Sequence, residues 1–173
     1  MLLTPDNPGF HLINGNFLSL DNMSDADYTI EDVATVLGRK QRFNDHIPDL
    51  KYSVAEHCYH ASFLYAYNRK GALMHDAAEW LTGDIPTPIK QRLQGIKEVE
   101  DLIDRDLQAR FNYEPVEKFT FKVIDNFLFQ VEHHLLFDTP EQIYDPSDAL
   151  ILEFWDEKEA TKKFIERFHE LSL

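Results

Sequence analysis

The chain has 173 residues, of which 43% are hydrophobic and 13% aromatic, a composition typical of one folded domain rather than of a disordered protein. Its formal net charge is −14, so the chain lacks the excess of basic residues that a general nucleic-acid binder needs, and we expect no polymeric nucleic acid as a partner. A single cysteine excludes an internal disulfide, and no apolar run approaches the roughly 20 residues that span a bilayer, so we expect a cytoplasmic protein without membrane contact.

The first 28 residues form the least regular part of the sequence. They mix Pro, Gly and Asn with short apolar runs at 10–13 and 16–20, and the Asn14-Gly15 pair between these runs is a turn signal. We therefore expect an irregular N-terminal arm or a small hairpin over residues 1–28.

After this arm the apolar residues recur with the helical period. Thr29 is a candidate N-cap with Asp32 three residues later, and Gly38 is predicted to end this first helix after Leu37. Further helices are predicted from Ser53 to about Arg69, with Ser53 and Glu56 as a capping box; from about Gly71 to Leu81; after Pro86 and Pro88; over 96–111; over 116–137, buried on most sides; and from Ser147 to about Leu171. The sequence thus predicts an all-α protein, a single domain over residues 1–173 with six or seven helices.

Four polar side chains interrupt these apolar helices, namely His57, His75, Asp76 and Asp125. Burying an imidazole beside a carboxylate is costly unless another group compensates, and a bound metal ion does so. Side chains from facing helices can converge in the core of a bundle, and two histidines with two carboxylates suit Mn, Fe, Co, Ni or Zn better than Ca or Cu(I). A single histidine on an apolar face is more often a hydrogen-bonded core residue, so the prediction of a metal site rests on the whole set.

The order His57…His75-Asp76…Asp125 resembles the metal motif of the HD-domain phosphohydrolase superfamily, whose fold is an all-α, HD-type helical bundle. Further likeness to the 5′-deoxynucleotidase branch lies in the segments 52–57, 73–79, 82–88 and 122–125. Compact phage-type triphosphohydrolases that act on dATP look similar over the same segments. Together the similar segments cover roughly residues 29–135.

The resemblance implies one divalent transition metal, Zn, Co or Mn, and leaves open a second, phosphate-bound divalent ion; the ligands that it implies are His57, His75, Asp76 and Asp125. Glu79 matches the catalytic acid/base position of the family, and Asp84 matches its second carboxylate. The spacing agrees, because Glu79 follows His75 by four residues and shares its helix face, from which a carboxylate can orient or deprotonate a water. The alternatives are a solvated helix carboxylate for Glu79 and a turn residue that caps the following helix for Asp84.

Substrate contacts also come from the resemblance. In the deoxynucleotidase branch an Arg-aromatic pair, usually Arg-Trp, lies beside the nucleoside, and Arg42-Phe43 occupies that place here. Phenylalanine keeps a stacking surface but lacks the indole N–H donor, which leaves the base preference open. In the phage-type group an Arg and two Lys meet the phosphates, and the matching positions are Arg42, Lys90 and Lys122. The alternative for each lysine is an ordinary surface residue.

We therefore expect a metal-dependent phosphohydrolase of deoxyribonucleotides that attacks the α-phosphate. Because three cationic positions exceed what a monophosphate needs, the sequence favours a dNTP triphosphohydrolase, with dATP as one candidate substrate, over a 5′-deoxynucleotidase that releases phosphate from dNMPs. Another HD phosphohydrolase, acting for instance on a signalling nucleotide, and a non-catalytic metal-stabilised helical module are the further alternatives. The resemblance implies a homo-oligomer, and a phage-encoded protein would act in the host cytoplasm.

Overall fold

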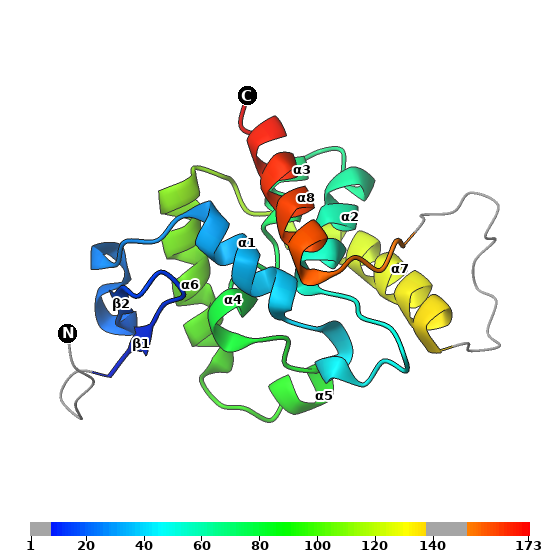
Figure 1. Cartoon of the computed structure of the whole chain (residues 1–173), viewed down its shortest axis with the longest axis horizontal. Helices are drawn as coiled ribbons and strands as arrows, with labels where there is room; N and C mark the ends of the chain where they lie inside the picture. The colour runs from blue at the N-terminus through cyan, green and yellow to red at the C-terminus, as the bar shows by residue number, and fades with distance from the viewer. Residues whose placement is uncertain (1–7, 138–151) are drawn as a thin grey trace.

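The computed structural model describes residues 8–137 and 152–173, which fold into packed helices with one small hairpin (Figure 1). The elements are β1 Phe10–His11, β2 Phe17–Leu18, the 3-10 segment η1 Leu20–Asp25, α1 Ile30–Arg39, the 3-10 segment η2 Arg42–Asp45, α2 Val54–Leu64, α3 Arg69–Leu73, α4 Glu79–Thr82, α5 Thr87–Lys90, α6 Ile96–Phe111, α7 Lys118–Phe137 and α8 Glu157–Glu170. β1 and β2 pair antiparallel around Gly15, with Phe10 opposite Leu18. The predicted all-α fold class is confirmed.

The core lies between α1, α2, α6 and α8. Val33 and Leu37 of α1, Leu107 of α6 and Phe164 of α8 are completely buried in one cluster. Helix α2 packs against α1, α3, α7 and α8 and is buried around nearly its whole circumference. A polar side chain on α2, such as His57, is therefore shielded from water and needs a partner.

Helix α1 begins as predicted but ends later. Thr29 and Asp32 form the reciprocal capping box. The prediction that Gly38 ends the helix is wrong, because α1 continues to Arg39 and Gly38 is buried against α8. A Cβ atom at Gly38 would lie 2.5 Å from Thr161 Oγ1 and 3.0 Å from the Glu157 carbonyl oxygen. Glycine is needed here for the close approach of two helices rather than for a turn.

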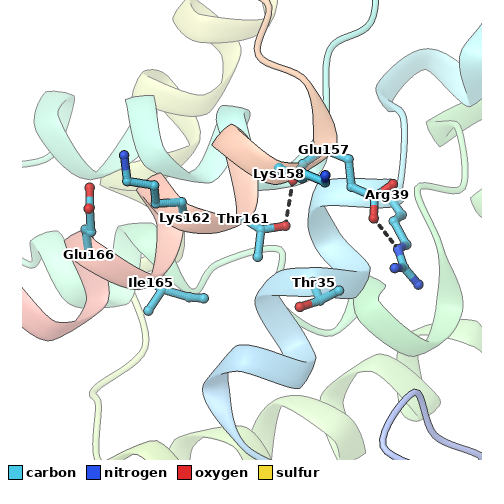
Figure 2. Close-up of a pocket in the computed structure, with 8 residues that line it drawn as sticks. All are labelled: Thr35, Arg39, Glu157, Lys158, Thr161, Lys162, Ile165 and Glu166. Atoms are coloured by element: carbon cyan, nitrogen blue, oxygen red, sulfur yellow. Dashed lines mark hydrogen bonds and ion pairs between the residues drawn. The ribbon is translucent and has the colours of Figure 1, made fainter.

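The two helices of this contact also carry an ion pair on their exposed side. Figure 2 shows Arg39 of α1 directed at Glu157 of α8, with Nε 2.5 Å from Oε1. The adjacent pocket, of about 480 Å³, is lined by α1 and α8 side chains such as Thr35 and Ile165. None of its lining residues belongs to the predicted site.

The predicted helix over 71–81 is interrupted at the histidine-aspartate pair. α3 ends at Leu73 and α4 begins at Glu79. Between them the backbone tightens into i to i+3 hydrogen bonds, such as Glu79 N–H to the Asp76 carbonyl at 3.0 Å. His75 Nδ1 lies 2.7 Å from the Ala72 carbonyl oxygen, the acceptor that a continuing α-helix would offer to the Asp76 N–H. The His75 side chain therefore takes the place of a backbone donor and interrupts the helix.

The preceding helix also differs from its predicted bounds. α2 ends at Leu64 rather than near Arg69, and Asn68 then caps α3 by accepting from the Gly71 N–H at 2.8 Å. Ser53 caps α2 by accepting from the Glu56 N–H at 3.1 Å. The reciprocal half of the predicted capping box is absent, because the Glu56 carboxylate reaches elsewhere.

The Glu56 carboxylate holds the segment that leads into α8. It accepts backbone hydrogen bonds from Glu153, Phe154 and Trp155, at 3.2, 2.9 and 2.9 Å. These bonds keep the segment out of the helical conformation, and α8 begins only at Glu157, with Asp156 as its N-cap. The predicted start of this helix at Ser147 falls outside the described residues. The prediction that residues 152–156 are helical is wrong.

Glu56 gives a stability prediction. Replacing it with glutamine should lower the free energy of unfolding by about 2 kcal/mol, because the amide would oppose a donor to one of these three N–H groups, which are buried or half-buried, and remove the charge from the others. Urea unfolding at pH 7 would measure the loss. The exposed Glu166→Gln is the control, with a change expected within about 0.5 kcal/mol. An equal effect of both substitutions would contradict the prediction.

Helix α7 is less buried than predicted. Phe121, Leu128 and Val131 face the core, whereas Phe119 and Val123 are 85% and 64% exposed. The expectation of burial on most sides is wrong for the described residues, because the helix carries apolar side chains on two faces and only one of them packs on α2 and its neighbours. Within the described ranges no helix combines the length and apolarity needed to cross a membrane.

Candidate metal centre

Four side chains from three separate parts of the chain meet beside α2. His57 projects from the middle of α2, His75 and Asp76 come from the tight turn between α3 and α4, and Asp125 comes from α7. One ligand atom each from His57, His75 and Asp125 lie within 4.8 Å of one another. The structure thus brings the predicted set together.

The distances within this cluster suit a small cation. His57 Nε2 lies 3.1 Å from His75 Nε2, 3.5 Å from Asp76 Oδ2 and 3.6 Å from Asp125 Oδ1. His75 Nε2 lies 3.2 Å from Asp76 Oδ2. Ligands that bind one tetrahedral metal at the usual bond lengths are separated by about 3.3 Å. These residues therefore fit a divalent transition metal.

The charges of the pair His75 and Asp76 are coupled. Burial opposes charge on both groups, but the carboxylate beside His75 raises the pKa of the imidazole well above its usual value. The same contact lowers the pKa of Asp76. In the metal-free chain the two side chains thus form an ion pair, and a cation that binds His75 must displace a proton from it.

Behind His57 lies a carboxylate that the sequence reasoning missed. Glu132 of α7 is completely buried, and its Oε1 lies 2.5 Å from His57 Nδ1. Burial would raise the pKa of Glu132, but Arg42 and His57 lower it below its usual value. The signal in the sequence is its position seven residues after Asp125, about two helical turns along an apolar segment, where an acidic side chain needs a reason.

Glu79 is buried beside the cluster rather than solvated. It is 5% exposed, and its Oε2 has no hydrogen-bond partner among the described residues. Burial and then the negative charges of Asp76 and Asp84 raise its pKa well above the usual value. A carboxyl group with a raised pKa can hold a proton near neutral pH, which is the property that general acid catalysis requires.

Asp84 is placed by the loop after α4, where Gly83 adopts a φ of 79°. It lines a cavity of about 420 Å³ together with residues such as Gln41, Thr82 and Pro86. The short helix α5 has no side-chain cap, so the alternative in which Asp84 caps this helix is wrong. Its charge is instead among those that act on Glu79.

The four residues predicted to contact substrate are all engaged with other side chains. Arg42 is 8% exposed, with Nη2 3.1 Å from Glu132 Oε2 and Nη1 3.6 Å from Asp76 Oδ2. Lys90 Nζ lies 2.6 Å from Glu100 Oε1, and Lys122 Nζ lies 3.5 Å from Asp125 Oδ2. The structure therefore places Arg42 and Lys122 at the cluster itself, and each of the three cations already faces a carboxylate.

Phe43 begins a strained turn and packs on α7. Phe43 and the next two residues have positive φ angles of 52–60°, which are rare for residues other than glycine. Its ring centre lies 5.7 Å from that of Phe129 and 5.2 Å from that of Phe137. The aromatic surface that the resemblance assigns to a nucleoside is thus partly covered by α7.

A second cavity adjoins the cluster between α6 and α7. It has a volume of about 300 Å³, and its lining includes His75, Asp104, Tyr113, Phe121, Lys122 and Asp125. Asp104 Oδ1 is buried without a hydrogen-bond partner in the described part of the chain. Burial, followed by the charge of Asp76, raises the pKa of Asp104 from 3.8 to about 7.

Asp104 therefore predicts a pH dependence of stability. Because folding opposes its ionisation, the metal-free protein loses stability as pH rises from about 4 to about 7. Asp104→Asn removes this cost, so the free energy of unfolding of the variant relative to wild type should rise by about 2 kcal/mol between pH 5 and pH 8. Urea unfolding of both proteins with a chelator at the two pH values measures this; a constant difference would contradict it.

The sequence that carries this geometry is similar to a known family and to two curated proteins. The model of the family described as 5′-deoxynucleotidase YfbR-like matches residues 46–136, a range that contains all four cluster residues, Glu79, Asp84 and Glu132. The uncharacterized protein YfdR of Escherichia coli (strain K12) is 35% identical over 107 residues, which are 60% of this chain and 58% of that protein. An uncharacterized protein of Rhodobacter capsulatus is 33% identical over 115 residues, 61% and 59% of the two chains. The chain thus spans just under three fifths of the length of these curated relatives.

Proposed function

Because the chain belongs to the 5′-deoxynucleotidase YfbR-like family of HD-domain proteins, we propose that it is a metal-dependent phosphohydrolase that releases phosphate from deoxyribonucleoside 5′-monophosphates. The observation that carries this proposal is the convergence of two histidines and two aspartates at one point, with the buried carboxyl group of Glu79 beside them. A non-catalytic metal-stabilised module would not need a buried carboxyl group whose Oε2 has no hydrogen-bond partner among the described residues.

Four of the residues would bind the metal ion, and Glu79 would transfer a proton. His57, His75, Asp76 and Asp125 would hold one divalent ion, Zn, Co or Mn, which would supply a Lewis acid for the phosphate oxygens and a more acidic water. Glu79 would give its proton to the 5′-oxygen as the phosphorus–oxygen bond breaks and the oxygen of a water bonds to phosphorus, and the carboxylate that remains would take up the proton which that water releases. Asp84 would keep the pKa of Glu79 high through its negative charge.

The pairing of the cations supports the monophosphate. Three free cations would favour a triphosphate, but Arg42, Lys90 and Lys122 each face a carboxylate. Lys122 is the most accessible of these side chains, at 66% exposed, and would neutralise one phosphate group close to Asp125. The positive charge left for a β- and γ-phosphate is therefore small.

A dNTP triphosphohydrolase, with dATP among its candidate substrates, is the second candidate. The observation that favours it is the cavity of about 300 Å³ beside His75 and Asp125, whose lining includes Lys118 and Lys122. A longer phosphate chain would extend into this space, and a second, phosphate-bound divalent ion would offset its charge. The nucleoside would then lie on the side of Asp84 and Phe43.

Product analysis separates the two candidates. Each dNMP and dNTP, with its ribonucleotide as control, is incubated with protein and Mn²⁺, Co²⁺ or Zn²⁺, and nucleoside, phosphate and triphosphate are separated. Nucleoside with phosphate from dNMPs alone supports the monophosphate proposal, whereas nucleoside with triphosphate from dNTPs supports the second candidate. Absence of metal-dependent turnover on every nucleotide would overturn both.

We also propose that the protein acts in the cytoplasm and assembles as a homo-oligomer. The exposed apolar face of α7, which includes Phe119, Val123 and Phe129, offers a surface that association could cover. Sedimentation velocity tests the assembly, and a monomer at micromolar concentration would contradict it.

A further inference from the structure

We propose that Glu132 is the positioning residue of the metal centre, which fixes the nitrogen that His57 presents to the ion and ties Arg42 to the same site. This inference rests on the metal site of the proposed function. Glu132 belongs to α7, and its side chain is completely buried where α7 packs against α2. No reactive role has to be assigned to it.

The contacts of Glu132 are made by both of its oxygens. Oε1 accepts from the Tyr52 hydroxyl at 2.9 Å and lies 2.5 Å from His57 Nδ1. Oε2 accepts from Arg42 Nε at 3.2 Å and lies 3.1 Å from Nη2. The buried guanidinium compensates the charge of the carboxylate, which would otherwise be too costly in this place.

A carboxylate in this position selects one form of the imidazole. A carboxylate only accepts hydrogen bonds, so His57 must carry its proton on Nδ1, and the lone pair of a neutral ring then lies on Nε2. Nε2 is the atom that faces His75, Asp76 and Asp125. A hydrogen-bonded carboxylate behind a metal-binding histidine fixes the orientation of the ring and increases its affinity for the metal.

The same network reaches a second proposed ligand. Arg42 bonds Glu132 with one edge of its guanidinium, while its Nη1 lies 3.6 Å from Asp76 Oδ2. Glu132 thus supports His57 directly and Asp76 through Arg42. This gives Arg42 a positioning role that explains why it is almost completely buried, whereas a residue that only met substrate would be open to it.

The test compares two buried glutamates that flank His57 in different ways. Glu132→Gln keeps the shape of the side chain but allows the amide to donate to Nδ1 and favour the wrong imidazole form. Glu56→Gln is the matched control, because Glu56 is equally buried and directly precedes His57, yet its carboxylate holds the backbone of 153–155. Each protein is titrated with Co²⁺ and followed by its visible absorption, and the melting temperature of each metal-free protein is recorded.

We expect Glu132→Gln to raise the Kd for Co²⁺ by about 10–100-fold and to change the absorption spectrum, whereas Glu56→Gln lowers the melting temperature but leaves the Kd near that of wild type. Tyr52→Phe, which removes one hydrogen bond and no charge, should give a smaller increase and serves if Glu132→Gln does not fold. An unchanged Kd in Glu132→Gln and Tyr52→Phe, or an equal increase in Glu56→Gln, would overturn the inference. Wild-type protein that binds Co²⁺ without hydrolysing any nucleotide would instead refute the proposed function and leave the positioning role intact.

Discussion

Replacing Glu79 with glutamine should reduce turnover of the preferred deoxynucleotide by about 10²–10⁴-fold, the usual contribution of a general acid or base, while metal affinity stays close to wild type. Glu79 is buried beside the cluster, but its carboxyl group is not among the four proposed ligands, His57, His75, Asp76 and Asp125. Glutamine has the same shape and polarity without a transferable proton. The loss should therefore fall on kcat, with little change in KM.

The substitution is informative because it should not unfold the protein. The pKa of Glu79 is raised by burial and by Asp76 and Asp84, so ionisation of this group is unfavourable in the folded state. A group of this kind costs stability as pH rises above its unfolded pKa, and a neutral glutamine removes that cost. We expect Glu79→Gln to be at least as stable as wild type at pH 8, so lost turnover cannot be attributed to unfolding.

The control for this prediction is Glu98→Gln, an exposed carboxylate in the first turn of α6 that should leave kcat unchanged. Steady-state kinetics and a metal titration on the same preparations measure the effect. Turnover within a factor of about three of wild type would remove Glu79 from the reaction. Loss of metal together with turnover would make it a ligand instead.

Features that depend on neighbouring residues could be predicted from the sequence. The capping box of Thr29 and Asp32 spans three positions, and its chemistry is complete within them. The apolar period of residues 96–111 gave the bounds of α6 for the same reason. In each case the local sequence contains both partners of the interaction.

Features that depend on distant partners could not be predicted from the sequence. Gly38 is predicted to end a helix, but its role is set by Thr161, more than a hundred residues away. Glu56 has the spacing of a capping box, yet the backbone N–H groups of 153–155 compete for its carboxylate and win. The cluster itself spans His57 to Asp125, and spacing alone gives no reason for these side chains to meet. A resemblance to a family supplied that information, and it did not extend to Glu132.

Removing the metal should abolish turnover and lower thermal stability, and Asp125 gives the clearest test of where the metal binds. An ion at 100 times its Kd stabilises the folded state by about 2.7 kcal/mol, which corresponds to a melting temperature higher by about 5–10 °C for a chain of this size. A chelator should reverse this gain, and added Zn²⁺, Co²⁺ or Mn²⁺ should restore it. Differential scanning fluorimetry with and without each metal measures the shift.

Asp125→Ala should lose the metal-dependent shift and reduce turnover by more than about 10³-fold, because one of the converging ligands is gone. His133→Ala is the matched control: His133 lies on the same helix, eight residues further on, and its ring packs on those of Phe43 and Phe137. That substitution removes a potential metal ligand from α7 without touching the cluster, so the shift should persist. A full shift in Asp125→Ala would remove Asp125 from the set of ligands, and loss of the shift in His133→Ala would place the metal near His133 instead. Because a cation must displace the proton of His75, the shift should also be smaller at pH 6 than at pH 8.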